Sequence, residues 1–576
     1  MQQAGQRRAW AAACGVLFAL AAASGFAAAP APATPTVVPT PSQLSPDNRP
    51  DTPPEALPAQ PAAPVPRELG KPSDELAIDV SSFSVADDAP AELKAALPAL
   101  TAPFVGKGKN YEDLVNAASA VTRFLQRDLG YYLGYAYIPE QAPQDGQIRI
   151  GVLEGRLDHV ELVWSEGLPV RQEVVQAYLD HLRPGSILTV RDVERTVFLV
   201  NDLRGITVRA EVKAGSAPGT AILVFTPVAD ARLSGKVDVD NEGSRFIGET
   251  RVGVTGNWNS PLGRGDGLAL SALTSTTGGL NFGLFGYTTP LGSDGWRAGA
   301  SVSALHYSLD RHDFPLGLSG NGITANAFAL YPWVRSRNLN LFVLGAADRK
   351  NYSDSASVIT TKRHVDDLVA SLTGDFRDTL LSGAVNTFEL TGSSGHLHYD
   401  GGFPSGLDDA QSYRKVDYSF SRLQNLLTNR VLLYVALRGQ YALDNLDTTE
   451  QFRAGGPDGV RAFASGEGTG DSGQLLTTEL RWLPPEWLLG RWSHEIFVAA
   501  FVDAARVEFR HDPGLITRPP GYVNTASFGG AGVSLVWARP NAYALRLSVA
   551  KATHGVAVSD TATRDPRAYF QGTWFY

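Results

Sequence analysis

The chain divides into three stretches that differ in their pattern of hydrophobic and polar residues. Residues 30–73 are rich in proline and alanine and show no periodic pattern, which predicts an extended linker without a packed core. In residues 74–229, strand-like runs alternate with helical segments. In residues 230–576, apolar residues recur at every second position and are interrupted by Gly, Asn, Asp and Pro, which indicates a region built from strands.

The middle stretch repeats one order of elements, strand, helix, helix, strand, strand. In the first repeat, residues 74–156, apolar residues recur at helical spacing along the second helix, 111–129. In the second repeat, residues 157–229, the last two strands are expected at 207–213 and 219–226. Neither repeat contains a convergent set of reactive groups. We therefore interpret both as binding modules.

The expected strands of the last stretch have one apolar and one polar face. In residues 431–444, the odd positions are Val, Leu and Tyr, whereas the even positions include Arg438 and Gln440. Residues 541–551 alternate in the same way. A soluble sandwich would turn the apolar face inward, whereas a membrane barrel turns it outward to lipid and encloses a polar lumen.

Several features favour the membrane barrel. An open sheet of this length would expose an edge, and closure removes that edge. No later apolar run is long enough for a spanning helix. The length of the region suits 16 antiparallel strands of about 10 residues each with their connections. Aromatic residues typical of a membrane interface end the chain: Tyr569, Phe570, Trp574, Phe575 and Tyr576.

The first 29 residues have the features of a secretory signal peptide. Two arginines precede an apolar stretch, residues 10–23, that ends in small residues suited to cleavage. The only cysteine, Cys14, lies in this stretch, and the only methionine is Met1. A chain without the signal peptide would contain no sulfur, which excludes disulfides, thiolate metal sites and a cysteine nucleophile.

Charge and motif content exclude further classes of function. The net charge of −9 provides no positive field for nucleic acid. No phosphate-binding loop precedes a helix, so a nucleotide partner is not expected. Residues 470–473 are similar to a serine-protease nucleophile segment, but no histidine occurs in a matching context. His396 and His398 are the only close histidine pair, without further ligands nearby. We therefore expect a non-enzymatic protein with no catalytic residues, metal or cofactor.

Four short segments of the sequence point to one family. They are residues 199–205 (LVNDLRG), 240–245 (DNEGSR), 259–266 (NSPLGRGD) and 455–463 (GGPDGVRAF). They resemble the outer-membrane transporters of two-partner secretion, the haemolysin and filamentous-haemagglutinin secretion/activation proteins. The resemblance covers essentially everything from about residue 74 onward.

This resemblance implies a fold and a location. It implies two periplasmic α+β POTRA domains, at 74–156 and 157–229, followed by an all-β transmembrane barrel at 230–576 in the outer membrane of a Gram-negative bacterium. Members of the family often begin with a helix that plugs the pore. The proline density of residues 30–72 disfavours such a helix here.

The resemblance also implies a function and partners. The protein is expected to recognise an unfolded exoprotein, a β-helical adhesin or haemolysin, through its POTRA domains and to translocate it to the cell surface without nucleotide hydrolysis. Outer-membrane lipid is the other expected partner. An outer-membrane assembly or insertion factor of the same superfamily and a porin-type diffusion channel are the alternatives. An assembly factor normally has more POTRA domains, and a porin needs none.

The resemblance further implies a lumen loop near residues 455–473. Its tip would consist of Val460, Arg461, Ala462 and Phe463, and its arginine would face Asp503, which follows Phe501 in the barrel wall. We call this pair the latch, because a guanidinium and a carboxylate form a geometry-specific but reversible contact. Ala462 stands where glycine is usual and would be strained at positive φ.

Cargo capture is expected at the edges of the POTRA sheets by strand addition. The candidate strands are 207–213 and 219–226 in the second module and 147–153 in the first. The candidate contact residues are Thr207, Arg209, Glu211, Ile222 and Val224.

Overall fold

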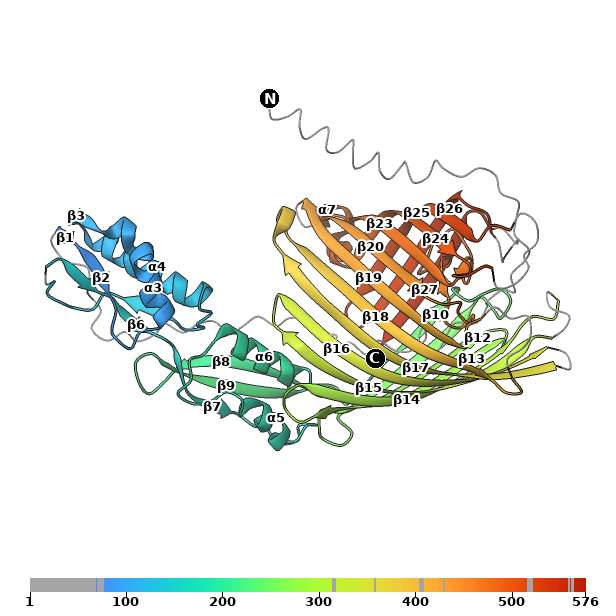
Figure 1. Ribbon diagram of the computed structural model, residues 1–576, viewed down its shortest axis with the longest axis horizontal. Helices are drawn as coiled ribbons and strands as arrows, with labels where there is room; N and C mark the ends of the chain where they lie inside the picture. The colour runs from blue at the N-terminus through green and yellow to red at the C-terminus, as the bar shows by residue number, and fades with distance from the viewer. Residues whose placement is uncertain are drawn as a thin grey trace, which may run out of the picture.

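The computed structural model describes residues 69, 77–143, 145–312, 317–356, 359–402, 409–427, 430–514, 522–557, 560 and 564–576. The expected signal peptide lies outside the described residues, and so do the linker apart from Leu69 and any plug helix within it. Two small α+β units lie at one end of a large barrel, and the second unit lies beside the barrel (Figure 1). Within the described residues, no helix is long and apolar enough to cross a membrane.

The first α+β unit packs two helices against short strands. Helix α4 begins at a capping box in which the Asn110 side chain accepts from the Asp113 amide at 2.9 Å and the Asp113 side chain accepts from the Asn110 amide at 3.1 Å. The expected strand 147–153 is divided in two, and its halves pair with different partners. The elements are β1 (Ile78–Val80), β2 (Ser82–Ser84), α3 (Ala91–Thr101), η1 (Ala102–Phe104), β3 (Gly106–Lys109), α4 (Tyr111–Arg127), β4 (Tyr135–Tyr137), β5 (Gln147–Arg149) and β6 (Gly151–Leu153).

The second unit has a three-stranded sheet covered by two helices. Its strand order is β7-β9-β8, with β7 parallel and β8 antiparallel to β9. Strand β8 is therefore an edge and β9 is central. The elements are β7 (Arg156–Leu162), α5 (Gln172–Leu179), α6 (Val190–Asn201), β8 (Ile206–Ala214) and β9 (Thr220–Ala229).

This strand order corrects one expectation. Ile222 and Val224 lie on β9, which is paired on both sides, so they belong to no free edge. The two strands of a hairpin have similar sequence patterns, so the sequence does not show which of them pairs with β7. In the structure β7 pairs in parallel with β9 and leaves β8 at the edge. Thr207, Arg209 and Glu211 do lie on the edge strand β8, with exposed side chains.

The barrel consists of 16 antiparallel strands, as predicted, and is closed by pairing of its first and last strands from Lys236↔Phe575 to Asp240↔Gln571. Its connections contain the short elements η2 (Leu380–Ser382), β21 (Phe452–Arg453), β22 (Thr469–Gly470), α7 (Glu486–Leu489) and η3 (Gly490–His494). The wall strands in order are β10 (Leu233–Asp240), β11 (Arg251–Asn259), β12 (Gly267–Ser275), β13 (Leu280–Leu291), β14 (Trp296–Ser308), β15 (Ser319–Arg335), β16 (Leu339–Ala356), β17 (Ile359–Asp378), β18 (Ala384–Tyr399), β19 (Ser412–Leu427), β20 (Val431–Ala442), β23 (Ser472–Trp482), β24 (Ile496–Glu508), β25 (Thr525–Arg539), β26 (Tyr543–His554) and β27 (Arg567–Phe575).

The outer face of the barrel is apolar. Leu270, Phe285 and Val302 are directly opposed on β12, β13 and β14 and are 54%, 49% and 52% exposed. Directly opposed residues point to the same side of a sheet, and their sequence neighbours point to the other side. The sequence neighbours of Val302 are Ser301, which is partly buried, and Ser303, which is buried. The barrel therefore has the apolar outer band and polar interior that the alternation predicted.

Helix α6 attaches the second unit to the barrel. Asp202, just after α6, accepts two hydrogen bonds from Arg335 at the end of β15, at 2.7 Å and 3.1 Å. The guanidinium also lies 5.0 Å from the ring centre of Phe198. Arg195 donates to the carbonyl oxygens of Pro332 and Asp294, both at 3.0 Å. Because Asp294 lies between β13 and β14, α6 bridges that connection and the end of β15.

Replacing Arg335 by alanine should loosen this attachment. The Asp202 and Arg335 side chains are only 7% and 5% exposed, and breaking a buried pair of this kind costs on the order of 3 kcal/mol. We expect spin labels at the exposed residues Lys213 and Lys551 to give a broader distance distribution by pulsed electron paramagnetic resonance in Arg335→Ala than in the wild type.

Arg349→Ala provides the matched control. Arg349 pairs with Asp366 on the surface, where both side chains are about half exposed (55% and 48%), and such a pair contributes only about 0–1 kcal/mol. The control should leave the distribution unchanged. An unchanged distribution in Arg335→Ala as well would show that the buried pair does not hold the unit in place.

Candidate functional site

The connection between β20 and β23, residues 443–471, folds into the barrel, and we call it loop L6. Its base is the β21–β22 hairpin, and Gly455 pairs with Val460 near its tip. L6 begins earlier than the expected 455–473, and the last two of those residues belong to β23. One buried apolar cluster joins the loop to the wall: Phe452, Ala454, Val460, Ala462, Phe463, Leu475, Phe501, Ala505, Val507, Phe528 and Ala550.

The tip of L6 is bound to the wall through Arg461. Its Nε and Nη2 donate to the two carboxylate oxygens of Asp503, each at 2.8 Å, and its Nη1 donates to Glu479 at 2.7 Å. The Arg461 amide also donates to Asp503, at 3.1 Å. The guanidinium carbon lies 3.3 Å from the ring centre of Phe501. The structure thus brings together Arg461, Phe501 and Asp503, the three residues named from sequence, and adds Glu479.

Two cations balance two carboxylates at this site. Glu479 also accepts from Arg481, at 2.8 Å and 2.9 Å. Burial lowers the pKa of the Arg461 guanidinium, but Asp503 and Glu479 outweigh burial, so that its pKa lies above its ordinary value. The cation therefore persists although Asp503 is fully buried. A contact of this kind is strong while water is excluded and weakens once the charges are hydrated.

Ala462 fits the tip without backbone strain. It is not among the described non-glycine residues with positive φ, which are Asp145, Ser260, Leu381, Ser382 and Asn541. A Cβ at Gly530 of β25 would lie 2.8 Å from the Ala462 methyl group. The methyl group therefore occupies space that the bare backbone of Gly530 leaves open.

Further bonds hold the tip on its other sides. The Phe463 carbonyl oxygen accepts from the Tyr569 hydroxyl of β27, at 2.7 Å. The Ser465 hydroxyl donates to the carbonyl oxygen of Glu242, also at 2.7 Å. Glu242 lies in residues 241–250, the connection between β10 and β11, which we call loop L1. The tip of L6 therefore bridges the wall and L1.

A second set of ion pairs, which sequence reasoning missed, holds the first arm of L6. Glu450 lies 2.6 Å from the Lys350 amine of β16 and 3.2 Å from the Lys415 amine of β19. Asp447 pairs with Arg363 of β17 at 3.0 Å. We call these contacts the root anchor. Burial raises the pKa of Glu450, but the two lysines outweigh it and hold the pKa well below its usual range.

The hydrogen bonds of Val208 show which backbone groups of β8 point away from the sheet at its free edge. Its amide donates to the Asn201 side chain at 2.6 Å, and its carbonyl oxygen accepts from the same side chain at 3.3 Å. Because Asn201 lies on the side away from β9, alternate residues of β8 direct their backbone groups outward. Ala210 and Val212 therefore offer N–H and C=O groups at the edge, while Arg209 offers its side chain to solvent.

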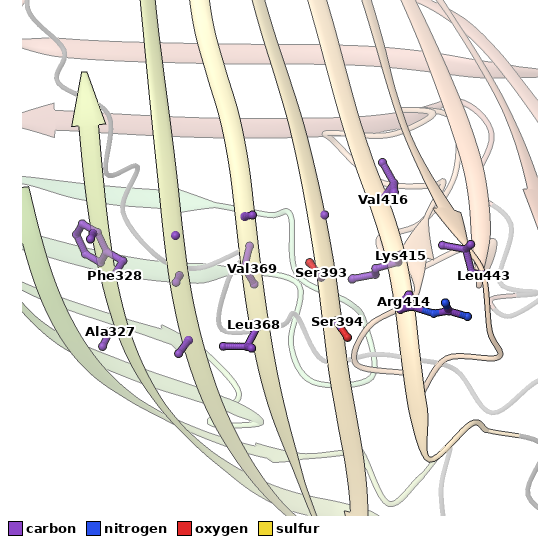
Figure 2. A pocket seen from close by; sticks show the side chains of 16 residues that line it. Ala327, Phe328, Leu368, Val369, Ser393, Ser394, Arg414, Lys415, Val416 and Leu443 are labelled. Atoms are coloured by element: carbon purple, nitrogen blue, oxygen red, sulfur yellow. The ribbon is translucent and has the colours of Figure 1, made fainter. Parts of the chain in front are cut away.

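A shallow hollow of about 700 Å³ lies on the wall from β15 to β20 (Figure 2). Ala327, Ala347, Leu368 and Ser394 are directly opposed on four neighbouring strands of this wall. Leu368 is 68% exposed, while the adjacent Asp367 faces the lumen. The hollow therefore follows a row of mostly small residues on the outward face, which is expected to meet lipid, and we assign it no ligand.

A closed barrel with an apolar outer band, a loop inside and two α+β units at one end defines an outer-membrane transporter of the POTRA-barrel class. Residues 219–512 match the family model described as haemolysin secretion/activation protein ShlB/FhaC/HecB. Residues 80–155 match the ShlB-type POTRA domain. The chain belongs to the ShlB/FhaC/HecB family of two-partner secretion transporters. The family resemblance, the fold class and the outer-membrane location with periplasmic POTRA domains are thereby confirmed.

Individual relatives agree with this assignment. The heme/hemopexin transporter protein HuxB of Haemophilus influenzae (strain 86-028NP) is 24% identical over 456 residues, which cover 78% of this chain and 79% of HuxB. The outer membrane transporter CdiB of Escherichia coli O6:K15:H31 is 25% identical over 396 residues, 66% of this chain and 65% of CdiB. The solved structure of CdiB from Escherichia coli has a TM-score of 0.67 at 19% identity and covers 89% of this chain and 93% of its own.

Replacing Arg461 by alanine should free the tip of L6. The change removes three side-chain hydrogen bonds from buried carboxylates, a loss of roughly 3 kcal/mol that raises the open fraction of the tip about 100-fold. A cysteine in place of the buried Ala464 reports the opening through its rate of reaction with a polyethylene-glycol maleimide. We expect that rate to rise in Arg461→Ala and to be intermediate in Arg461→Lys, which keeps the charge but not the planar fork.

Arg414→Ala is the control for this experiment. Arg414 is an exposed arginine that pairs with Asp444 at 3.4 Å outside the lumen. It should leave the labelling rate unchanged. Equal rates in Arg461→Ala and the wild type would mean that the apolar cluster and the remaining hydrogen bonds hold the tip without Arg461.

Proposed function

We propose that this transporter exports an unfolded protein partner, which its POTRA domains bind in the periplasm and which crosses the membrane through the barrel lumen without nucleotide hydrolysis. The observation that carries the proposal is the free edge of β8 on a unit that α6 fixes against the barrel. An extended polypeptide can add to such an edge as a further strand. The bound segment would then lie close to the entrance of the lumen.

The latch would hold L6 in the lumen at rest and so narrow the pore. Arg461 ties the tip of L6 to two carboxylates of the wall, and no covalent bond must break to release it. A polypeptide that enters the lumen brings backbone groups and water, and hydrated ion pairs contribute little. L6 could therefore yield to the entering chain and return when the chain has passed.

The energy for export would come from the cargo. The sequence has no phosphate-binding loop, so nucleotide hydrolysis has no obvious site. A chain that folds outside the cell cannot slide back, and its folding free energy draws the remainder outward. HuxB and CdiB are named as transporters, which supports export over the two alternatives, membrane-protein assembly and passive diffusion.

A proline at the free edge tests this proposal. Val212→Pro removes an N–H group that points away from the sheet, so the β8–β9 pairing is retained while strand addition loses a donor. We expect the amount of partner protein in the culture medium, measured by mass spectrometry, to fall about tenfold. This corresponds to a loss of roughly 1.4 kcal/mol in binding free energy. Deletion of residues 77–229 should abolish it and identify the exported protein.

Val212→Ala is the matched control, because it shortens the same side chain but keeps the N–H group. It should secrete at the wild-type level. Ion conductance of the purified variants in planar bilayers should be unchanged, which shows that the barrel is intact. If Val212→Pro exports normally, the β8 edge does not capture cargo. If the deletion exports normally as well, the POTRA domains have no receptor role.

A further inference from the structure

The strand contacts of L6 described above leave one sector of the barrel wall without a contact. The root anchor reaches β16, β17 and β19, and the tip reaches β23, β24, β25 and β27. All of these named contacts fall on strands from β16 onward. The remaining part of the circle is the wall from β10 to β15, beside which the tip contacts loop L1 through Ser465 and Glu242.

Cross-strand pairing shows which residues of β11 to β15 face the lumen. Asp367 faces it, because its carboxylate lies 2.6 Å from the Lys350 amine of the root anchor. Asp367 is directly opposed to Asp348, and Asp348 to Asn326. Since opposed residues share a face, the row continues inside the barrel through five residues that we call the neutral row: Asn326, Ser301, Gly286, Ala269 and Asn257.

The neutral row differs in chemistry from the wall beneath L6. None of its five members carries a charge, whereas the wall beneath L6 presents Arg481, Glu479 and Asp503. Side-chain amides and hydroxyls both donate and accept hydrogen bonds, as a polypeptide backbone does. Each such bond contributes only about 0.5–1.5 kcal/mol net. An extended chain can therefore exchange these contacts with water without being trapped.

Loop L1 covers the adjacent part of this wall. Phe246 and Ile247 of L1 pack against Leu284 and Leu305, which face the lumen on β13 and β14. Leu284 and Leu305 lie farther from the POTRA end of their strands than Gly286 and Ser301. The neutral row thus lies on the POTRA side of the L1 cluster.

The second POTRA domain docks on the strands that carry the neutral row. The Arg171 and Arg204 amides donate to the carbonyl oxygens of Gly263 and Gly265, at 2.9 Å and 3.2 Å, in the connection between β11 and β12. Arg195 contacts the connection that follows β13, and Asp202 contacts Arg335 at the end of β15. The POTRA interface is therefore continuous with the periplasmic ends of β11 to β15.

We propose that the neutral row is the surface along which the unfolded partner enters the barrel. This inference rests on the proposed function and specifies its path. The partner it fits is an extended polypeptide, which the β8 edge delivers to the sector of the lumen that L6 leaves free. The charged wall on the other side holds L6 and does not guide cargo.

Single cysteines test this path, and the sequence downstream of Cys14 contains no other thiol. Ser301→Cys and Asn326→Cys place a thiol on the neutral row, and Ser534→Cys is the matched control. Ser534 faces the lumen through its pairing with Ala499, which opposes Arg481, but it is only 3% exposed. The full-length chain without Cys14 is purified, inserted in planar bilayers and treated on the POTRA side with a trimethylammonium methanethiosulfonate.

We expect the reagent to lower cation conductance about twofold in Ser301→Cys and Asn326→Cys, because a fixed positive charge repels permeating cations. Ser534→Cys should not respond. A flexible peptide of glycine, serine and asparagine, added on the same side, should block the untreated channel briefly. The blocks should be fewer once Ser301→Cys has been modified.

Other outcomes overturn the proposal. A response of Ser534→Cys equal to that of Ser301→Cys would show that L6 does not divide the lumen. No response on the neutral row, in two variants that insert and conduct normally, would show that this sector is closed. Modification without any effect on peptide blocks would make the sector a path for ions only. Because the POTRA experiment is read from secretion, failure of the proposed function remains distinguishable from failure of this path.

Discussion

The need to pair every backbone group in a hydrocarbon environment is the constraint on which the rest of the structure depends. An unpaired N–H or C=O in the membrane costs several kcal/mol, so a spanning sheet must close on itself. Here β10 and β27 meet, and the Thr573 hydroxyl donates to Asp238 across the seam at 2.6 Å. Once the sheet is closed, period-two alternation separates an apolar exterior from a polar interior. The interior can then hold charged groups that lipid would exclude.

Those charged groups position L6. Arg461, between Asp503 and Glu479, ties the tip, and Glu450, between two lysines, ties the first arm. The two attachments reach strands from β16 to β27, and none of those named lies on the strands from β10 to β15. The wall from β11 to β15 carries the uncharged neutral row and continues into the interface with the second α+β unit. One loop thereby makes the two sectors of the barrel wall different, because its attachments to strands all fall on β16 to β27.

The sequence predicted the parts of this structure that depend on periodicity or on a motif that resembles the family. The length of the region indicated the strand number, alternation indicated the polarity of the faces, and the resemblance around Arg461 implied its contact with Asp503. Strand order was not predictable, because the sequence of a hairpin does not show which of its two strands pairs with a third strand. Ile222 and Val224 were assigned to a free edge for that reason. Glu450 was missed because its partners, Lys350 and Lys415, are distant in sequence. Lysines on a lumen face were the available signal, since a buried cation requires a carboxylate nearby.

Locking the seam of the barrel tests the central claim most directly. Cysteines in place of Asp238 and Thr573, whose side chains already meet, would form a disulfide between β10 and β27, with each single variant as a control. The account holds that cargo passes through the lumen of a closed barrel, so secretion should continue at the level of the single variants while the seam is oxidised. Secretion that stops on oxidation and returns with a reductant would show that the wall itself must open.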